Sequence, residues 1–284
     1  MSKIAIVTDS TAYIPSDLIQ KHNLTVAPQV LIWGEETFED GVDIQPDEFY
    51  ARLKTSKAMP TTSQVSISKM KSTFEDLVKQ GYDVLAIFLS AKLSGTIQSA
   101  IQAKDMMDEA GEKVTFIDSN STAMALGFQV LTVARAVEDG ANLEEAVALA
   151  EKAREHTGVY FAVDTLEFLH RGGRIGGAQR FLGTALNMKP VLAVQGGRVE
   201  AVERIRTKSK AIDRVLELVM EQCQGKSPIH LATLHAAAED EARTLLDKAA
   251  KELNPTESIL TSVSPVVGTH AGPGTVGLAY MSGM

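Results

Sequence analysis

The chain has 284 residues, of which 44% are hydrophobic, and a formal net charge of −8. This length is enough for one large domain or two mid-sized ones, and the acidic charge argues against non-specific binding to nucleic acids or anionic membranes. Cys223 is the single cysteine, which excludes an internal disulfide and fits a reducing compartment. We expect a cytoplasmic protein without stable membrane insertion. The start MSKIAIVTDS lacks signal-peptide anatomy, and the most apolar long segment, residues 122–137, contains Gln129, Thr132 and Arg135.

The first half of the chain alternates strand-like and helix-like segments. Residues 3–9 are short, β-branched and mostly apolar, as in a buried parallel strand. The predicted strands cover residues 3–9, 24–33, 83–90 and 113–119, and Pro28 predicts an edge or irregularity in the second. The predicted helices are a short one from residue 15 and longer ones over residues 45–56, 67–80, 94 onward, 122–140 and 142–156. This alternation predicts a mostly parallel, doubly wound sheet.

The helix predicted from residue 122 is apolar nearly all round. Such a helix usually packs on both sides in a core, and we favour that interpretation. The alternative, that part of it lines an apolar ligand channel, stays open.

The second half has a different pattern. Its strand candidates are residues 158–165, 190–195, 198–206, 228–236 and 258–265. Gly196 and Gly197 separate two β-rich runs, which is a strong hairpin signal. Antiparallel pairing is therefore expected, in a second α+β domain that begins near residue 157.

Hydroxyl and carboxyl side chains follow several predicted strands of the first half. Ligands of doubly wound sheets bind outside the carboxyl ends of the strands, so we expect these side chains to converge on one rim: Asp9, Thr61, Thr62, Ser63, Ser94, Thr96, Asp118 and Ser119. The residues 60–67 between them read as a loop that opens a helix. For Asp9 and Asp118 we favour a structural role, in which the carboxylate bonds to loop amides.

Ser94 has two interpretations of equal weight, helix capping and ligand binding. The third residue after it is Ile97, so no capping box is present. Gly95 allows a ligand to approach the backbone, and the amides of the following helix would favour an anion.

Two glycine-rich motifs lie in the second half. LEFLHRGGRIGG, residues 166–177, has neither the spacing of a dinucleotide fingerprint nor the Gly-Lys-Ser/Thr of a P-loop. GTHAGPGTVGLAY, residues 268–280, places His270 in a predicted glycine-rich turn, whereas His235 reads as a strand-end or capping residue. No pair of histidines or acids has metal-site spacing, so we predict no metal and no cofactor.

The ordered set of motifs VTDST, PTTSQVS, LSAKLSGTIQSA, FIDS, LEFLHRGGRIGG, NMKPVLAVQGGRV and GTHAGPGTVGLAY spans nearly the whole chain. In this set the sequence resembles the DegV family, the fatty-acid-binding B component of bacterial fatty acid kinase. The resemblance implies an N-terminal three-layer α/β domain with a parallel sheet, residues 1–156, and a C-terminal α+β domain with an antiparallel sheet, residues 157–284. It places a fatty acid between the two domains.

Carried over residue by residue, the resemblance implies that Thr62 and Ser94 contact the carboxylate, with Gly95 offering an amide and His270 close to the head group. The predicted ligand-binding set is Thr62, Ser94, Gly95, Thr96, Ser119, Arg171 and His270, and the predicted partner-facing residues are Arg174 and Arg206. The sequence departs from the family pattern at Val65, where proline is common, and at Lys92-Leu93, where a second serine often follows Ser90.

The function that the resemblance implies is binding of a long-chain fatty acid in an apolar tunnel. The protein would present the carboxylate to an ATP-dependent fatty acid kinase subunit and carry the acyl phosphate to an acyltransferase of phospholipid synthesis. It would be a substrate-binding subunit rather than an enzyme, since it has no nucleotide-binding motif of its own.

Two alternatives come from other functional classes. The first is a stand-alone hydrolase or acyltransferase with Ser94 as nucleophile and His270 as base, although Lys92 breaks the Gly-x-Ser-x-Gly elbow. The second is a nucleotide-binding regulator that uses the paired glycines Gly172, Gly173, Gly176 and Gly177.

Overall fold

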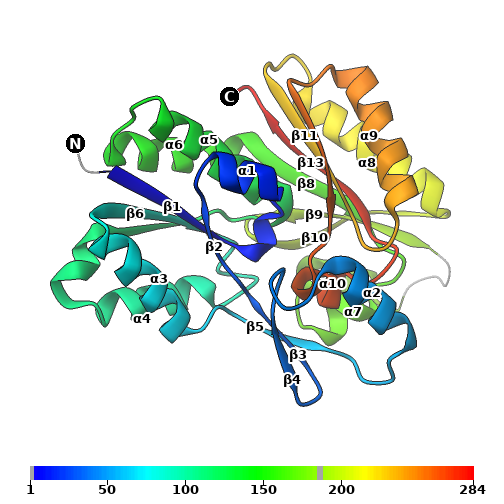
Figure 1. The fold of residues 1–284 in the computed structure, drawn as a ribbon. Coiled ribbons are helices and arrows are strands. Elements are labelled where there is room, and N and C mark those ends of the chain that lie inside the picture. The colour runs from blue at the N-terminus through cyan, green and yellow to red at the C-terminus, as the bar shows by residue number, and fades with distance from the viewer. Residues whose placement is uncertain (1–2, 184–187) are drawn as a thin grey trace.

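The computed structural model describes residues 3–183 and 188–284, which form two large sheets and one small one. Figure 1 shows the first large sheet with β1 and β6, and the second with β8 to β13. The first residue of the NMKPVLAVQGGRV motif, Asn187, lies outside the described residues.

The first sheet has the strand order β2-β1-β6-β7 and is parallel throughout. Its strands are β1 (Lys3–Asp9), β2 (Thr25–Ala27), β6 (Tyr82–Phe88) and β7 (Val114–Asp118). Alternate side chains of β6 face opposite ways: Leu85 and Ile87 join a core with α5 (Ala123–Glu138), and α6 (Leu143–His156) covers the same face. Val84, Ala86 and Phe88 pack against α3 (Ile67–Lys79) and α4 (Thr96–Asp105). The predicted doubly wound parallel sheet is therefore confirmed.

The predicted strand over residues 24–33 is wrong as a single unit. It breaks at Pro28: β2 stays in the parallel sheet, while β3 (Val30–Trp33) pairs antiparallel with β4 (Glu36–Glu39) and β5 (Thr61–Ser63). Proline has no amide to donate to a ladder, and the next residue, Gln29, turns its buried side chain to Thr96 of α4. The predicted loop at residues 60–67 likewise contains a strand, β5.

The second sheet has the order β10-β9-β8-β13-β11-β12. Its strands are β8 (Thr157–Ala162), β9 (Lys189–Gln195), β10 (Arg198–Ile205), β11 (Ile229–His235), β12 (Glu257–Ser262) and β13 (Val276–Ser282). The pairing is antiparallel except between β11 and β12, which are parallel. The predicted hairpin is confirmed between β9 and β10, where Gly196 and Gly197 have φ of 54° and 83°.

The central strand β13 was not expected from the sequence. All seven of its residues are buried between β8 and β11, although the segment reads as glycine-rich and lacks polar alternation. Gly277 is required there because a Cβ would lie 2.7 Å from the Phe161 side chain and 2.8 Å from the Tyr160 carbonyl of β8.

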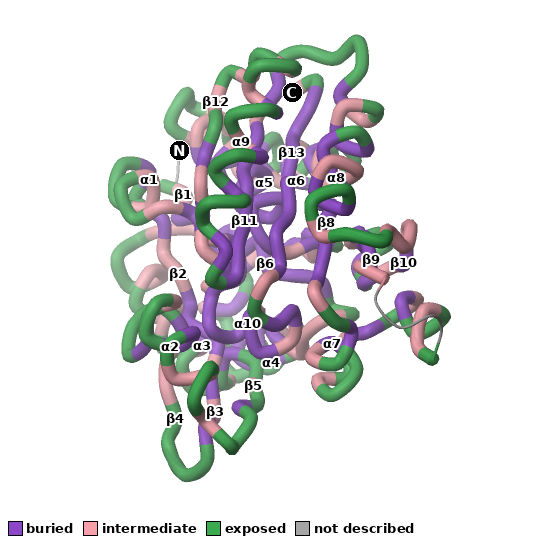
Figure 2. The backbone as a smooth tube through the Cα atoms, turned by 90° about the vertical axis from the view of Figure 1, so that its right-hand side faces the viewer, coloured by how far each residue is buried: buried purple, intermediate pink, exposed green. Residues whose placement is uncertain are grey.

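Helix α5 lies between the two large sheets. It contacts β1 and β6 of the first and β8, β11 and β13 of the second, so the predicted packing on both sides is confirmed. Figure 2 shows this interior as continuously buried. The sheets change between His156 and Thr157, but because α5 belongs to both cores the division into domains at that point stays a prediction.

The outer face of the second sheet is covered by α8 (Lys208–Cys223) and α9 (Glu239–Leu253). The shorter helices and 3-10 turns connect the sheets: η1 (Ser10–Ala12), α1 (Ser16–Lys21), α2 (Pro46–Thr55), η2 (Asp108–Lys113), α7 (Glu167–Arg171), η3 (Gly176–Phe181) and α10 (Pro265–Ala271). Within residues 3–183 and 188–284, none of the helices has the length and apolar character needed to cross a membrane.

Candidate functional site

A cavity lies between the two sheets and the small sheet that carries β5. Centres of water-sized molecules can occupy about 100 Å³ of it, within an atom-free region of about 860 Å³ that includes open solvent at its mouth. Most of the wall is aliphatic or aromatic, and it comes from both halves of the chain: Leu89, Leu93, Ala123, Val159, Phe161, Leu169, Val194, Val199, Leu234, Val263, Val266, Val267 and Ala271. The polar side chains of the wall include Thr62, Ser94, Arg174 and His270.

Thr62 and His270 form the first polar contact of this wall. Thr62 Oγ1 lies 2.7 Å from His270 Nε2, although the two residues are 208 positions apart in the sequence. The edge strand β5 carries Thr62, and α10 lies against β3 and β5. The predicted glycine-rich turn at His270 is wrong: the residue lies in the last turn of α10, which Ser264 caps, and the turn with Gly272 and Gly274 follows it.

His270 is neutral at physiological pH. Burial, and to a smaller degree the charge of Arg174, lower the pKa of His270 to about 4. Within the described residues, Nδ1 has no hydrogen-bond partner. We assign the proton to Nε2, because this tautomer leaves only a lone pair unpaired rather than a buried N–H donor. The ring then donates to Thr62 Oγ1, and the hydroxyl proton of Thr62 is free for an anion in the cavity.

Ser94 belongs to a second chain of polar contacts. Its hydroxyl lies 2.9 Å from Thr96 Oγ1, and Gln29 Nε2 donates to the same Thr96 oxygen at 2.8 Å. Thr96 and Gln29 are buried. Because Thr96 accepts from Gln29, it can donate to Ser94, which leaves the Ser94 hydroxyl proton for a ligand. The side chain of Ser94 does not cap α4, whose N-cap is Gly95, so helix capping does not account for it.

Arg174 supplies positive charge to the same wall. Its Nε donates to the Leu93 carbonyl at 3.1 Å and its Nη1 to the Gly172 carbonyl at 2.8 Å. No carboxylate of the described residues forms an ion pair with it. The remaining N–H donors and the unneutralised charge favour an anion beside Thr62 and Ser94.

Close packing limits the space at three of the four paired glycines of the LEFLHRGGRIGG motif, Gly172, Gly176 and Gly177. A Cβ on Gly172 would lie 2.0 Å from His270 Nδ1, and one on Gly177 would lie within 1.8 Å of a Glu200 carboxylate oxygen. Gly176 has φ of 49° and would meet the Val199 carbonyl. These contacts account for Gly172 and Gly176 without a nucleotide loop, whereas the flexible Glu200 side chain could move away from a Cβ on Gly177.

Several predicted residues lie away from the cavity wall. Thr96 is not in the wall but contacts Ser94, which is. Gly95 packs against Gln64: a Cβ on Gly95 would lie 3.2 Å from the end of the Gln64 side chain. Ser119 bonds to the backbone of Ser121 and lines a separate polar groove with Arg154.

The three predicted arginines differ in their surroundings. Arg171 is exposed and pairs with Glu167, and Arg206 is exposed beside Asp164 and Lys189. Arg174 lines the cavity, and that it faces a partner stays a prediction.

The carboxylates at the strand ends have the structural role that we favoured. Asp9 accepts the amides of Thr11 and Leu89, and Asp118 accepts those of Asn120 and Ala91. Both carboxylates therefore hold the loops that form the cavity wall. Sequence reasoning missed Gln29 and Tyr13, which also line the cavity. The signal for Gln29 was a lone amide in the apolar run VAPQVLIW.

The geometry does not support nucleophilic catalysis. His270 Nε2 contacts Thr62 rather than Ser94, and Ser94 contacts Thr96. The described residues also contain no carboxylate bonded to His270 Nδ1 and no group of three or more His, Cys, Asp or Glu able to hold a metal. The site is suited to binding an amphiphilic anion.

The chain is similar over nearly its whole length to known proteins. A family model described as "Uncharacterised protein, DegV family" matches residues 3–283. A DegV domain-containing protein of Streptomyces coelicolor is 38% identical over 281 residues, 98% of each chain. A fatty-acid-binding DegV family protein from Thermus thermophilus has a TM-score of 0.92 at 36% identity and 99% coverage of both chains. A stearic-acid-binding protein from Eubacterium ventriosum has a TM-score of 0.91 at 26% identity, covering 99% of this chain and 98% of the other. With a family model spanning nearly its whole length, this chain belongs to the DegV family.

Proposed function

We propose that this protein binds one long-chain fatty acid, with the acyl chain in the apolar cavity and the carboxylate beside Thr62, Ser94 and Arg174. The observation that carries the proposal is the pair of hydroxyls, each held by a buried hydrogen-bond chain so that its proton is free. The fatty-acid-binding relatives from Thermus thermophilus and Eubacterium ventriosum support the same ligand class.

The two parts of the ligand have different energetic roles. At roughly 0.8 kcal/mol per buried methylene, a chain of about fifteen methylenes provides on the order of 12 kcal/mol before the cost of association. A buried carboxylate without donors would cancel much of that gain. The hydroxyls and the guanidinium therefore fix the orientation of the carboxylate, while the acyl chain supplies most of the affinity.

The same placement suits a carrier for a kinase. The head-group residues Thr62, Ser94 and Arg174 are only partly buried, so the carboxylate would lie near the mouth of the cavity. We propose that an ATP-dependent kinase subunit phosphorylates it there, and that this protein carries the acyl phosphate to an acyltransferase of phospholipid synthesis. Arg206, exposed near Lys189, is our candidate for contact with the kinase.

Native mass spectrometry of the purified protein, followed by extraction of the bound molecule, tests the binding step. We expect one fatty acid per chain in the wild type and loss or marked weakening in Ser94→Ala. Ser99→Ala is the matched control, since Ser99 lies in α4 and outside the cavity wall. A wild-type protein that stays empty when offered saturated and unsaturated fatty acids would exclude the proposal.

The kinase step needs a separate assay. Incubation with a bacterial fatty acid kinase subunit and ATP should yield acyl phosphate, detected as the hydroxamate after hydroxylamine trapping. Arg206→Glu should bind fatty acid normally but slow this reaction. Equal rates for the variant and the wild type would remove Arg206 from the docking surface.

A further inference from the structure

Asp40, directly after β4, is a buried carboxylate that lies outside the cavity wall. It is 1% exposed and lies between the end of β1, the end of β4 and the start of α10. Ser10 Oγ donates to its Oδ2 at 2.6 Å, and the Val266 amide donates to its Oδ1 at 3.2 Å. One carboxylate therefore joins segments that are 226 residues apart.

The first contact path from Asp40 leads to His270. Val266 is in the first turn of α10, and His270 is in the last turn of the same helix. On its other side α10 is confined by Tyr50 of α2, whose hydroxyl donates to the Val263 carbonyl and would lie 2.4 Å from a Cβ on Gly268. The carboxylate thus holds the beginning of the helix whose end places His270 against Thr62.

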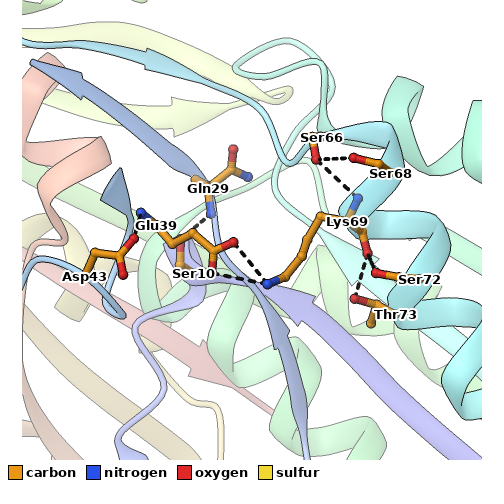
Figure 3. Close-up of polar contacts among 9 residues, drawn as sticks. All are labelled: Ser10, Gln29, Glu39, Asp43, Ser66, Ser68, Lys69, Ser72 and Thr73. Carbon is orange, nitrogen blue, oxygen red and sulfur yellow. Dashed lines mark hydrogen bonds and ion pairs between the residues drawn. The ribbon is translucent and has the colours of Figure 1, made fainter. Parts of the chain in front are cut away.

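The second contact path leads to Ser94. Ser10 Oγ, which donates to Asp40, accepts the Gln29 amide at 3.1 Å, and the Asp40 amide donates to the Gln29 carbonyl. Figure 3 shows Ser10 meeting Gln29 beside the ion pair between Lys69 of α3 and Glu39, which anchors the end of β4. The Gln29 side chain then donates to Thr96, which contacts Ser94.

The negative charge of ionised Asp40 destabilises the folded protein, because the carboxylate is buried. Within residues 3–183 and 188–284, no Lys, Arg or His nitrogen forms an ion pair with it. The titratable groups that face it are Asp9 at the end of β1, Tyr13 after η1 and Tyr50 of α2; Ser264 and Ser10 add hydroxyls. Burial raises the pKa of Asp40 to about 6, and the hydrogen bonds from Ser10 and Val266 only partly offset this effect. A buried carboxylate whose desolvation is not offset by an ion pair lowers stability, so we expect it to have a role other than stabilising the fold.

We propose that Asp40 is a positioning residue for the head-group site: its carboxylate sets the placement of both His270, through α10, and Ser94, through Ser10, Gln29 and Thr96. This inference rests on the proposed function and adds to it that ligand affinity depends on the ionisation of a residue outside the cavity wall. Hydrogen bonds to an ionised carboxylate are about twice as strong as neutral ones. Protonation of Asp40 therefore weakens its hydrogen bonds from Ser10 and from Val266, and with them both contact paths.

Asp40→Asn keeps the shape of the side chain and removes the charge. Val266 and Ser10 donate to different oxygens of Asp40, and an asparagine has only one acceptor oxygen, so in this geometry the variant accepts from one of them and not from the other. We expect the variant to bind fatty acid about tenfold more weakly than the wild type at pH 8.0, since about 1.4 kcal/mol separates a charged from a neutral hydrogen-bond pair of this kind.

The test is isothermal titration of delipidated protein with hexadecanoate from pH 5.5 to pH 8.0, read as the ratio of wild-type to variant affinity at each pH. The ratio cancels the titration of the ligand itself. It should fall from about tenfold at pH 8.0 to about threefold at pH 5.5, where about a quarter of Asp40 stays ionised. Asp47→Asn, the same change at an exposed site in α2, is the matched control and should match the wild type throughout.

A ratio that stays constant from pH 5.5 to pH 8.0, or equal affinities at pH 8.0, overturns the inference. If Asp40→Asn does not fold, Ser10→Ala replaces it, because it cuts only the path to Ser94. About threefold weaker binding, with a pH dependence shifted to higher pH because Ser10 no longer lowers the pKa of Asp40, supports the inference, and unchanged binding overturns it. A folded wild type that binds no hexadecanoate at any pH overturns the proposed function instead, and the inference with it.

Discussion

The packing of His270 against Gly172 gives the sharpest prediction about the head-group site. The ring lies between two fixed neighbours: Nε2 is 2.7 Å from Thr62 Oγ1, and Nδ1 faces the backbone of Gly172. In Gly172→Ala the new methyl carbon would lie 2.0 Å from Nδ1, far inside van der Waals contact. The ring cannot shift toward Thr62, so it must rotate out of the site.

The size of the effect follows from the contact that is lost. Rotation breaks the hydrogen bond that directs the Thr62 hydroxyl at the ligand, and a net loss of about 1 to 2 kcal/mol is usual for one such bond. We therefore expect fatty acid affinity to fall about 5- to 30-fold, measured by isothermal titration calorimetry. The backbone itself is not the cause, because Gly172 has φ of −74°, which alanine readily adopts.

Two companion variants test whether the clash with His270 causes the loss of affinity. Gly173→Ala adds a methyl group at φ of +70° with nothing within 4 Å, so it strains the backbone without touching His270 and should leave affinity nearly unchanged. In a His270→Ala background the Gly172→Ala change should cost nothing further. If Gly172→Ala binds as the wild type does, or weakens binding equally in both backgrounds, the clash with His270 is not the mechanism.

Three further predictions concern charge. Asp40→Asn should raise the midpoint temperature of unfolding more at pH 8 than at pH 5. Folding raises the pKa of Asp40 from 3.8 to about 6, so the wild type loses stability as pH rises through this range and Asp40 ionises. The loss is about 3 kcal/mol at most, and the asparagine variant avoids it. The hydrogen bond from His230, with help from Arg135, lowers the pKa of Glu257 to about 2, so its stabilisation is present above about pH 4.5 and lost toward pH 2. Denaturant titrations of Glu257→Gln and wild type should therefore converge at acid pH. Arg174→Gln should weaken fatty acid binding several-fold and raise the pKa of His270, measured by NMR, since the guanidinium charge lowers that pKa.

Several parts of the fold follow from local sequence pattern alone. The alternation of side chains in β6 follows from the two-residue period of a strand between two helical layers, so VLAIF could be read as a buried parallel strand. Gly196 and Gly197 predict their hairpin because type I′ turns need positive φ at both positions. Thr62, Ser94 and His270 could be named from motifs, because those positions carry the polar groups at segment ends.

How these segments meet depends on contacts between parts of the chain that are far apart in sequence. Pro28 marked an irregularity, but the antiparallel partners of β3 come from later in the chain, and no local signal predicts their register. The contact of Thr62 with His270 and that of Asp40 with Val266 each span more than 200 residues. Such long-range contacts form when α10 packs against the small sheet, an arrangement set by the whole core rather than by neighbours in sequence. The same packing turned Arg174 toward the cavity and made Gln29 a link between β3 and α4.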